Sequence, residues 1–226
     1  MLILGIPSLN QFDALRACID SALSGTVAPD RVYVVDNSGG VYPPRWQDRY
    51  EGRVLAYQAS HNCGVARSWN VLCGAASGDG ATGIILSNDD ITFAPDTIAR
   101  LLEVAEANER AATVSTIEGQ RFSLLWLRLA AWQAIGPFDE QFWPAYFEDK
   151  DYDHRLLLAG WEHPIAPSAV AHRGSATLKA YNEAQQTEHH RQFRRNMARF
   201  VRKWGNVPEG ALWDEPYNGA PPEVSW

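Results

Sequence analysis

Two adjacent carboxylates, Asp89 and Asp90, are the residues of this sequence that most directly suggest chemistry. They follow residues 82–86, an apolar run with the character of a central buried strand. Like charges in contact repel each other, and burial at a strand end removes part of their hydration. A divalent cation relieves both effects, because Mg²⁺ and Mn²⁺ prefer hard oxygen ligands such as carboxylates and phosphates. A turn that caps the next segment explains the same residues, and their spacing alone does not decide between these interpretations.

Polar residues also follow two earlier strand-like segments. Pro7 and Ser8 end the first apolar run, and Asp36 follows the β-branched run at residues 31–35. Ligands of open α/β sheets bind outside the C-terminal ends of the strands. We therefore expect these residues and Asn88 to lie along one rim, where Asp36 would accept a hydrogen bond from a base imide or a ribose hydroxyl.

A second acidic cluster, Glu148, Asp149 and Asp151, follows the aromatic-rich run at residues 142–147. Acidic residues are common at helix starts, because they favour the positive end of the helix dipole. The preceding aromatic residues indicate a pocket wall, and a carboxylate in such a wall is suited to act as a general base. From the residues alone, a structural role and a catalytic role both remain open.

His172 lies at the end of a strand-like stretch and is followed by Arg173 and Gly174. A lone histidine is more often a satisfied surface or core residue than a ligand. The glycine permits close approach of a ligand, so His172 is also a candidate for contact with a metal or a diphosphate. Arg173 is an equal candidate for the diphosphate.

These residues need a scaffold, and the first half of the chain alternates strand-like and helix-like segments. The alternation is typical of an α/β fold with a mostly parallel central sheet flanked by helices, and the second half is mixed. We expect one domain over residues 1–205 and an irregular tail over residues 206–226. We expect strands near residues 2–7, 31–35, 54–57, 82–86, 112–116 and 122–126, and helices near residues 10–24 (with Asn10 as N-cap), 65–77, 95–105, 130–135, 147–159 and 188–203.

Composition and missing motifs exclude several classes of protein. No stretch approaches the roughly 20 apolar residues that a membrane-spanning helix requires, and three cysteines without a metal-ligand pattern favour a cytoplasmic location. The net charge of −7 argues against a protein that coats nucleic acid. Pro7 stands where a dinucleotide-binding G-x-G-x-x-G would follow the first strand, and no P-loop motif occurs. Side chains and a metal must therefore hold any phosphate.

Taken in order, these segments resemble the inverting family 2 glycosyltransferases of the GT-A fold, in particular the rhamnosyltransferase-like branch. The resemblance spans nearly the whole chain and rests on several short motifs in the right order, none of them specific alone. The motifs are residues 2–10 (first strand), 34–38 (second strand), 62–70 (N-x-G-x-A-x-x-x-N), 88–90 (D-x-D position), 136–140 (G-x-F-D-E), 148–151 (E-D-x-D), His172, 195–196 and 203–205.

The resemblance implies a role for each matching residue. Asp149 would be the catalytic base, and Asp90 and His172 would bind a divalent cation, Mn²⁺ or Mg²⁺. The acceptor side would include Trp143, Tyr146 and Glu148. Binding of the nucleotide-sugar donor would involve Pro7, Ser8, Asn10, Asp36, Asn62, Gly64, Arg67, Asn70, Asn88 and Asp89.

One residue departs from the family pattern: Asn88 stands where the D-x-D motif has its first aspartate. We expect weaker metal binding rather than loss of function, because asparagine still hydrogen-bonds ribose or a metal-bound water. The implied reaction is inverting transfer from a UDP- or dTDP-sugar to an acceptor hydroxyl. The acceptor stays open between a glycan, a lipid-linked sugar, a protein and a modified nucleic-acid base. The alternatives are a nucleotidyltransferase and a non-catalytic nucleotide-sugar-binding protein of the same fold.

The helix expected near the C-terminus carries a basic face and an apolar face over residues 188–204. The two faces suit peripheral contact with an anionic membrane or with nucleic acid. They equally suit an apolar face that packs on the domain and leaves the arginines in water.

Overall fold

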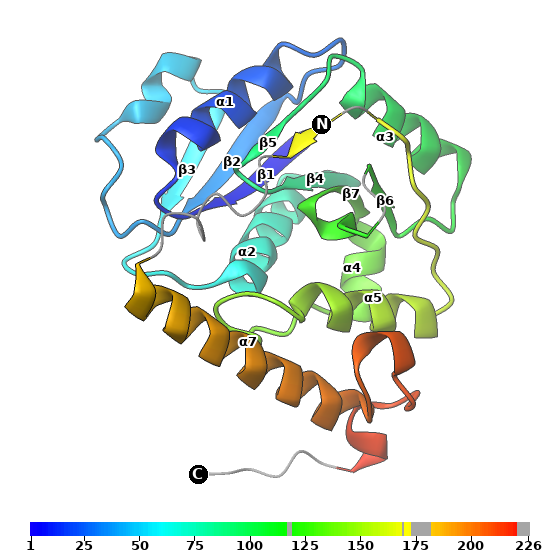
Figure 1. Cartoon of the computed structure of the whole chain (residues 1–226). Helices are drawn as coiled ribbons and strands as arrows, with labels where there is room; N and C mark the ends of the chain where they lie inside the picture. Colours follow the sequence, from blue (N-terminus) through cyan, green and yellow to red (C-terminus); the bar gives the residue numbers. More distant parts are fainter. Residues whose placement is uncertain (117–118, 169, 173–181, 221–226) are drawn as a thin grey trace.

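The computed structural model describes residues 1–116, 119–168, 170–172 and 182–220, without the side chain of His172. A six-stranded sheet in the order β3-β2-β1-β4-β7-β6 forms its centre (Figure 1). Four neighbouring strands, β3, β2, β1 and β4, run parallel, whereas β7 and β6 are antiparallel to their neighbours. The strands are β1 (Ile3–Ser8), β2 (Arg31–Asp36), β3 (Val54–Gln58), β4 (Gly83–Ser87), β6 (Thr113–Ser115) and β7 (Leu124–Arg128). The prediction of an α/β fold with a mostly parallel sheet is confirmed.

Helices cover both faces of the sheet (Figure 1). Alternate residues of β1 supply the two cores: Leu4 and Ile6 belong to one buried cluster, and Ile3 belongs to the other. This alternation follows from the two-residue period of a strand. The cluster with Leu4 includes residues of α1 and α3, and the cluster with Ile3 includes residues of α2, α4 and α5. The helices are α1 (Phe12–Leu23), α2 (Val65–Gly78), α3 (Thr97–Ala107), α4 (Leu129–Ile135), α5 (Glu148–Leu158) and α7 (Glu183–Trp204).

Two helix starts differ from the sequence predictions. Asn10 is not the N-cap of α1; it adopts a left-handed φ of 57°, and the helix begins at Phe12. The backbone N–H of Gln11 donates to the hydroxyl of Tyr42 at 3.1 Å, so a distant tyrosine replaces the expected local cap. Helix α7 begins at Glu183 instead of residue 188, because Asn182 and Gln185 form a reciprocal capping box.

The C-terminal segment after α7 packs back on the domain. Gly205 ends α7 in the left-handed conformation, and a Cβ there would lie 2.8 Å from the ring of Trp213. The carbonyl of Trp213 lies 3.1 Å from Nε2 of His154 on α5. Two short 3₁₀ turns, η3 (Pro208–Gly210) and η4 (Pro216–Gly219), complete the described part of this segment. The predicted boundary at residue 205 stays a prediction.

None of the helices in the described part of the chain is long and apolar enough to cross a membrane.

Candidate active site

A cavity of about 440 Å³ opens at the C-terminal ends of β1 and β4. Its wall is completed by the loop before α5, the first residues of α5 and the N-terminal half of α7. Parallel strands bring their C-terminal ends to one rim, and the cavity lies where rim positions were expected to converge. The predicted site residues that line it are Pro7, Ser8, Asn62, Gly64, Asn88, Asp89, Asp90, Tyr146, Glu148 and Asp149.

Several predicted site residues lie outside this lining. Asp36 is buried at the end of β2, where its Oδ1 accepts from the N–H of Ser38 at 2.8 Å, and its neighbour Asn37 lines the cavity instead. The Asn70 side chain donates to the carbonyl of Phe138 and accepts from its N–H, both at 2.9 Å. Asn10, Arg67 and Trp143 also do not line the cavity.

The Ser8 hydroxyl, which also contacts the Tyr42 hydroxyl, holds the Asp89 carboxylate at the rim of the sheet. The Ser8 hydroxyl donates to Oδ2 of Asp89 at 2.6 Å and also lies 2.7 Å from the Tyr42 hydroxyl. Burial, opposed by the Ser8 hydrogen bond and reinforced by the charge of Asp90, raises the pKa of Asp89 to about 6. Tyr42 was not found by sequence reasoning, because it lies in a loop with no motif around it.

Asp89 and Asp90 place two neighbouring carboxylates in the cavity wall. Two neighbouring carboxylates, one of them buried and the other with a raised pKa, are the situation that a bound cation relieves. Strand β5 (Ile91–Thr92), directly after Asp90, pairs with β8 (Ala171–His172) and places the backbone of His172 opposite Ile91. The His172 side chain and Arg173 lie outside the described residues. Within the described part, no three His, Cys, Asp or Glu side chains form a metal-binding group.

Glu148 and Asp149 form the first turn of α5, after two residues in a left-handed conformation. Tyr146 and Phe147 have φ values of 75° and 72°, and such values cost non-glycine residues of order 1–2 kcal/mol each. This turn aims the start of the helix at the cavity, which both acidic residues line. Burial raises the pKa of Asp149. Burial and then the charge of Asp149 raise the pKa of Glu148 well above its ordinary value.

Asn196 of α7 holds the loop that carries this turn. Its side-chain amide is fully buried and donates to the backbone carbonyls of Trp143, Ala145 and Tyr146 at 3.2, 2.9 and 3.3 Å. These three hydrogen bonds offset part of the free-energy cost of the left-handed backbone at Tyr146 and Phe147. Asn196 is therefore a site-supporting residue; the family resemblance included residues 195–196 but implied no role for Asn196.

The other side of this loop contacts the segment before α2. Indole Nε1 of Trp143 donates to the carbonyl of Asn62 at 3.1 Å, and the N–H of Val65 donates to the carbonyl of Pro144 at 2.8 Å. Gly64 lies between them with a φ of 86°, and a Cβ there would approach Trp143 to 2.8 Å. The predicted Gly64 is thus required by close packing at the cavity wall.

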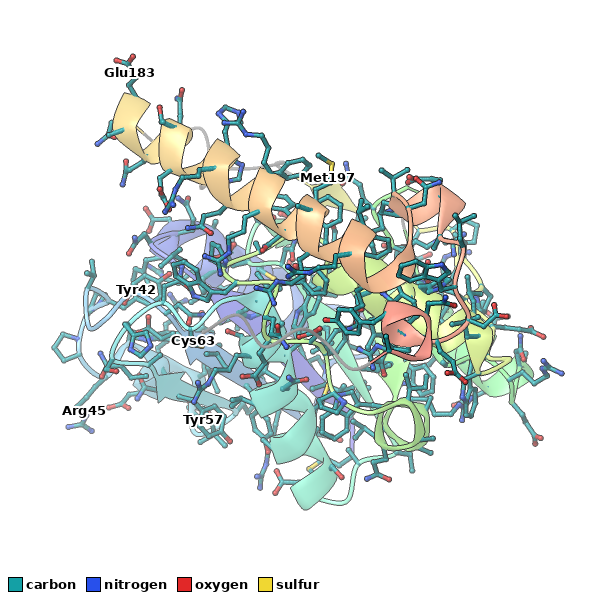
Figure 2. All side chains as sticks on the ribbon, turned by 90° about the horizontal axis from the view of Figure 1, so that it is seen from below. Tyr42, Arg45, Tyr57, Cys63, Glu183 and Met197 are labelled. Carbon is teal, nitrogen blue, oxygen red and sulfur yellow. The ribbon has the colours of Figure 1, made fainter. Side chains whose placement is uncertain are left out.

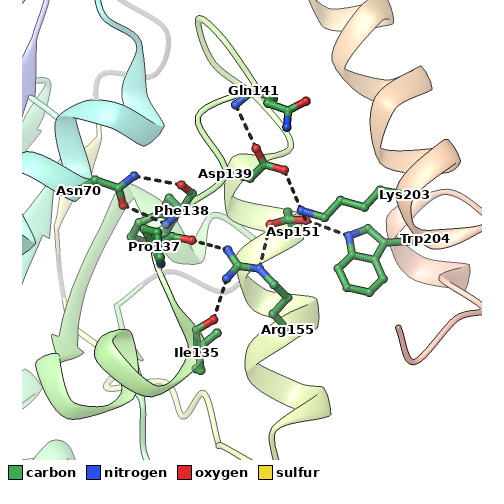
Figure 3. A network of polar contacts seen from close by, with 10 residues as sticks. All are labelled: Asn70, Ile135, Pro137, Phe138, Asp139, Gln141, Asp151, Arg155, Lys203 and Trp204. Atoms are coloured by element: carbon green, nitrogen blue, oxygen red, sulfur yellow. Dashed lines mark hydrogen bonds and ion pairs between the residues drawn. The ribbon is translucent and has the colours of Figure 1, made fainter. Parts of the chain in front are cut away.

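A buried ionic network fixes α5 against α7 (Figure 3). Asp151 is fully buried and binds Nζ of Lys203 at 2.6 Å, Nε of Arg155 at 3.0 Å and Nε1 of Trp204 at 2.9 Å. Lys203 also binds Asp139 at 2.7 Å. Asp151, one turn after Glu148, therefore anchors the helix and does not line the cavity.

Helix α7 also supplies residues of the cavity wall itself. His189 and Gln192 line the cavity, and sequence reasoning missed both because it treated this helix as a separate surface. Figure 2 shows the helix crossing one side of the molecule from Glu183 past Met197. Its apolar residues Phe200 and Trp204 are buried, so the apolar face packs on the domain. The expected contact of this face with a membrane is not supported.

Comparison with known proteins identifies relatives of this architecture. The model of the family described as Glycosyl transferase family 2 matches residues 4–157. No curated protein sequence matches the chain.

Solved structures share the fold at low sequence identity. A mannosyltransferase, PcManGT from Pyrobaculum calidifontis in complex with GDP-Man and Mn²⁺, is 15% identical with a TM-score of 0.63, and the match covers 93% of this chain and 66% of that one. S. aureus TarS 1-349 is 13% identical with a TM-score of 0.62, over 90% of this chain and 73% of that one. The same protein in complex with UDP-GlcNAc is 13% identical with a TM-score of 0.62, over 88% and 65%. This chain thus spans about two thirds of the length of these structures.

Proposed function

This chain belongs to glycosyl transferase family 2, and from that premise we propose that it transfers a sugar from a nucleoside-diphosphate sugar to an acceptor hydroxyl with inversion. The observation that carries the proposal is the cavity in which Asp89 and Asp90 of the sheet rim and Asp149 of α5 are all wall residues. One part of the wall suits a diphosphate, and another provides a base for an acceptor.

Asp149 is the proposed general base. Its carboxylate takes the proton of the acceptor hydroxyl while the hydroxyl oxygen forms a bond to the anomeric carbon. The bond from that carbon to the diphosphate oxygen breaks, and its electron pair leaves with the nucleoside diphosphate. A single displacement of this kind inverts the anomeric centre.

Asp90 is the proposed cation ligand, and His172 is proposed beside it on the strength of the β5–β8 pairing. A bound Mn²⁺ or Mg²⁺ would neutralise charge on the two phosphates. Ser8 orients Asp89 through its hydrogen bond, and Asn88, which lines the cavity, is proposed to bind the ribose or a metal-bound water.

The donor proposed first is a UDP- or dTDP-sugar, on the basis of the family resemblance at Asp36. Two neighbours of the same fold were solved with different donors, GDP-Man in the mannosyltransferase and UDP-GlcNAc in TarS. A panel of donors must therefore include UDP-, dTDP- and GDP-sugars.

The test is release of free nucleotide from each donor in the presence of Mn²⁺, with and without acceptors. We expect turnover of at least one donor, a loss of about 10²–10⁴-fold in kcat for Asp149→Asn, and an unchanged KM for the donor. Asp13→Asn on the exposed first turn of α1 is the matched control. Release of pyrophosphate from a nucleoside triphosphate would instead favour a nucleotidyltransferase. Donor binding without any turnover would favour a non-catalytic binding protein.

A further inference from the structure

Among the buried side-chain oxygens that lack a hydrogen-bond partner in the described part of the chain, two belong to residues that line the cavity. They are Oε2 of Glu148 and Oε1 of Gln192, in side chains whose residues are 5% and 6% exposed. An unsatisfied buried acceptor costs about 1–3 kcal/mol, and such groups in native proteins are rare. Two of them in one cavity wall indicate a ligand that donates hydrogen bonds.

The orientation of Gln192 is set by its neighbours on α7. Its amide nitrogen donates to Oε1 of Glu188, and a carboxylate can only accept from that amide. Glu188 is in turn fixed by two hydrogen bonds of 2.8 Å from Arg191. The carbonyl oxygen of Gln192 therefore keeps its place as an acceptor that the protein leaves unused.

Aromatic residues line the same cavity. The ring of Tyr146 lies 5.3 Å from that of His189 and 5.4 Å from that of Phe193, and both Tyr146 and His189 line the cavity. An apolar ring face together with a few fixed hydrogen-bond acceptors complements a molecule with C–H groups on its faces and hydroxyls at its edges. A sugar ring has this chemistry.

We propose that the acceptor is a carbohydrate, and that Glu148 and Gln192 accept hydrogen bonds from hydroxyls of the sugar residue that receives the new linkage. The proposal rests on the proposed glycosyl transfer and names its acceptor class. A lipid chain would leave both oxygens unsatisfied, and an anionic group would face the acidic pair of Glu148 and Asp149.

Gln192 is then a specificity-determining residue, and its variants test the idea. Gln192→Leu removes the acceptor at similar size. The double variant Glu188→Gln with Gln192→Glu keeps an oxygen acceptor at position 192 and lets the amide of position 188 donate the hydrogen bond between the two side chains. Arg194→Gln, an exposed change two residues further along α7, is the matched control. The assays are nucleotide release with water alone, nucleotide release with a panel of methyl glycosides, and saturation-transfer NMR of those glycosides on the protein with UDP and Mn²⁺.

We expect at least one glycoside to bind and to accelerate nucleotide release. Gln192→Leu should lower kcat/KM for that acceptor by about 10- to 100-fold more than it lowers hydrolysis by water. The double variant Glu188→Gln with Gln192→Glu should restore most of the loss. Equal losses in hydrolysis and transfer would show a merely structural role and overturn the inference.

The two proposals fail in different ways. Hydrolysis of a donor without binding or use of any glycoside would overturn the carbohydrate acceptor and leave the glycosyltransferase proposal intact. Glycoside binding that Gln192→Leu weakens, with no turnover of any donor, would support the subsite and contradict the transfer reaction.

Discussion

At the scale of single residues, burial and then the neighbouring groups set the pH at which Asp149 can act as a base. Burial raises the pKa of Asp149, the adjacent Lys150 lowers it, and Asp153 raises it. A base works in its ionised form, so kcat/KM should fall as the pH falls through this raised pKa, above the ordinary value of 3.8.

Lys150→Met should shift the fall of kcat/KM at acidic pH to higher pH by about 0.3–1 unit, because the cation that favours the carboxylate is lost. Lys150→Arg keeps the charge and should leave the pH of this fall unchanged. Lys150 is half exposed and pairs only with an exposed Glu209 at 3.8 Å among the ion pairs described, so we expect little loss of stability. A shift to lower pH in the pH profile of Lys150→Met would contradict the role of Asp149.

Sequence reasoning found the acidic residues of the site and missed the polar residues that support them. Asp89, Asp90, Glu148 and Asp149 stood in recognisable clusters and all line the cavity. Gln192 was not singled out at all, and Asn196 was noted only within the motif at residues 195–196, because a polar residue inside a helix carries no local signal of what it contacts. Their roles depend on tertiary packing of α7 against a loop some 50 positions earlier in the chain.

At the scale of elements, the contact between α5 and α7 depends on one buried charge pair. Lys203→Met would leave the Asp151 carboxylate buried with less compensation, since only Arg155 and Trp204 would still bind it. We expect a loss of about 3–5 kcal/mol in the free energy of unfolding, measured by urea denaturation.

Arg202→Met is the control for that change, because Arg202 is exposed on the same turn and should lose less than about 0.5 kcal/mol. Adding Asp151→Asn to Lys203→Met should recover part of the stability, since it removes the uncompensated charge. A loss below about 1 kcal/mol for Lys203→Met would show that the network contributes little.

The elements themselves were predictable where apolar periodicity was strong, as in β1, β2, β4 and α2. The early start of α7 was missed because residues 183–190 are polar, although the capping box of Asn182 and Gln185 was a readable signal. The sheet order and the antiparallel direction of β6 and β7 were not readable, because strand neighbours are chosen by long-range packing and not by local pattern.

At the scale of the whole molecule, the cavity wall is assembled from segments spread from β1 to α7. A ligand in that cavity should therefore stabilise the domain as one unit and shift a single unfolding transition. UDP with Mn²⁺ at about 100 times its Kd should add about 2.7 kcal/mol, which corresponds to a rise in Tm of roughly 5–10 °C for a domain of this size.

Removing the metal with a chelator should abolish most of the shift, and Asp90→Asn should do the same while Asp13→Asn does not. An equal shift with chelator would contradict the metal role of Asp90, because nucleotide binding would then need no cation. Two separate transitions, only one of them raised by UDP, would show that α7 does not belong to the cooperative unit that binds the nucleotide.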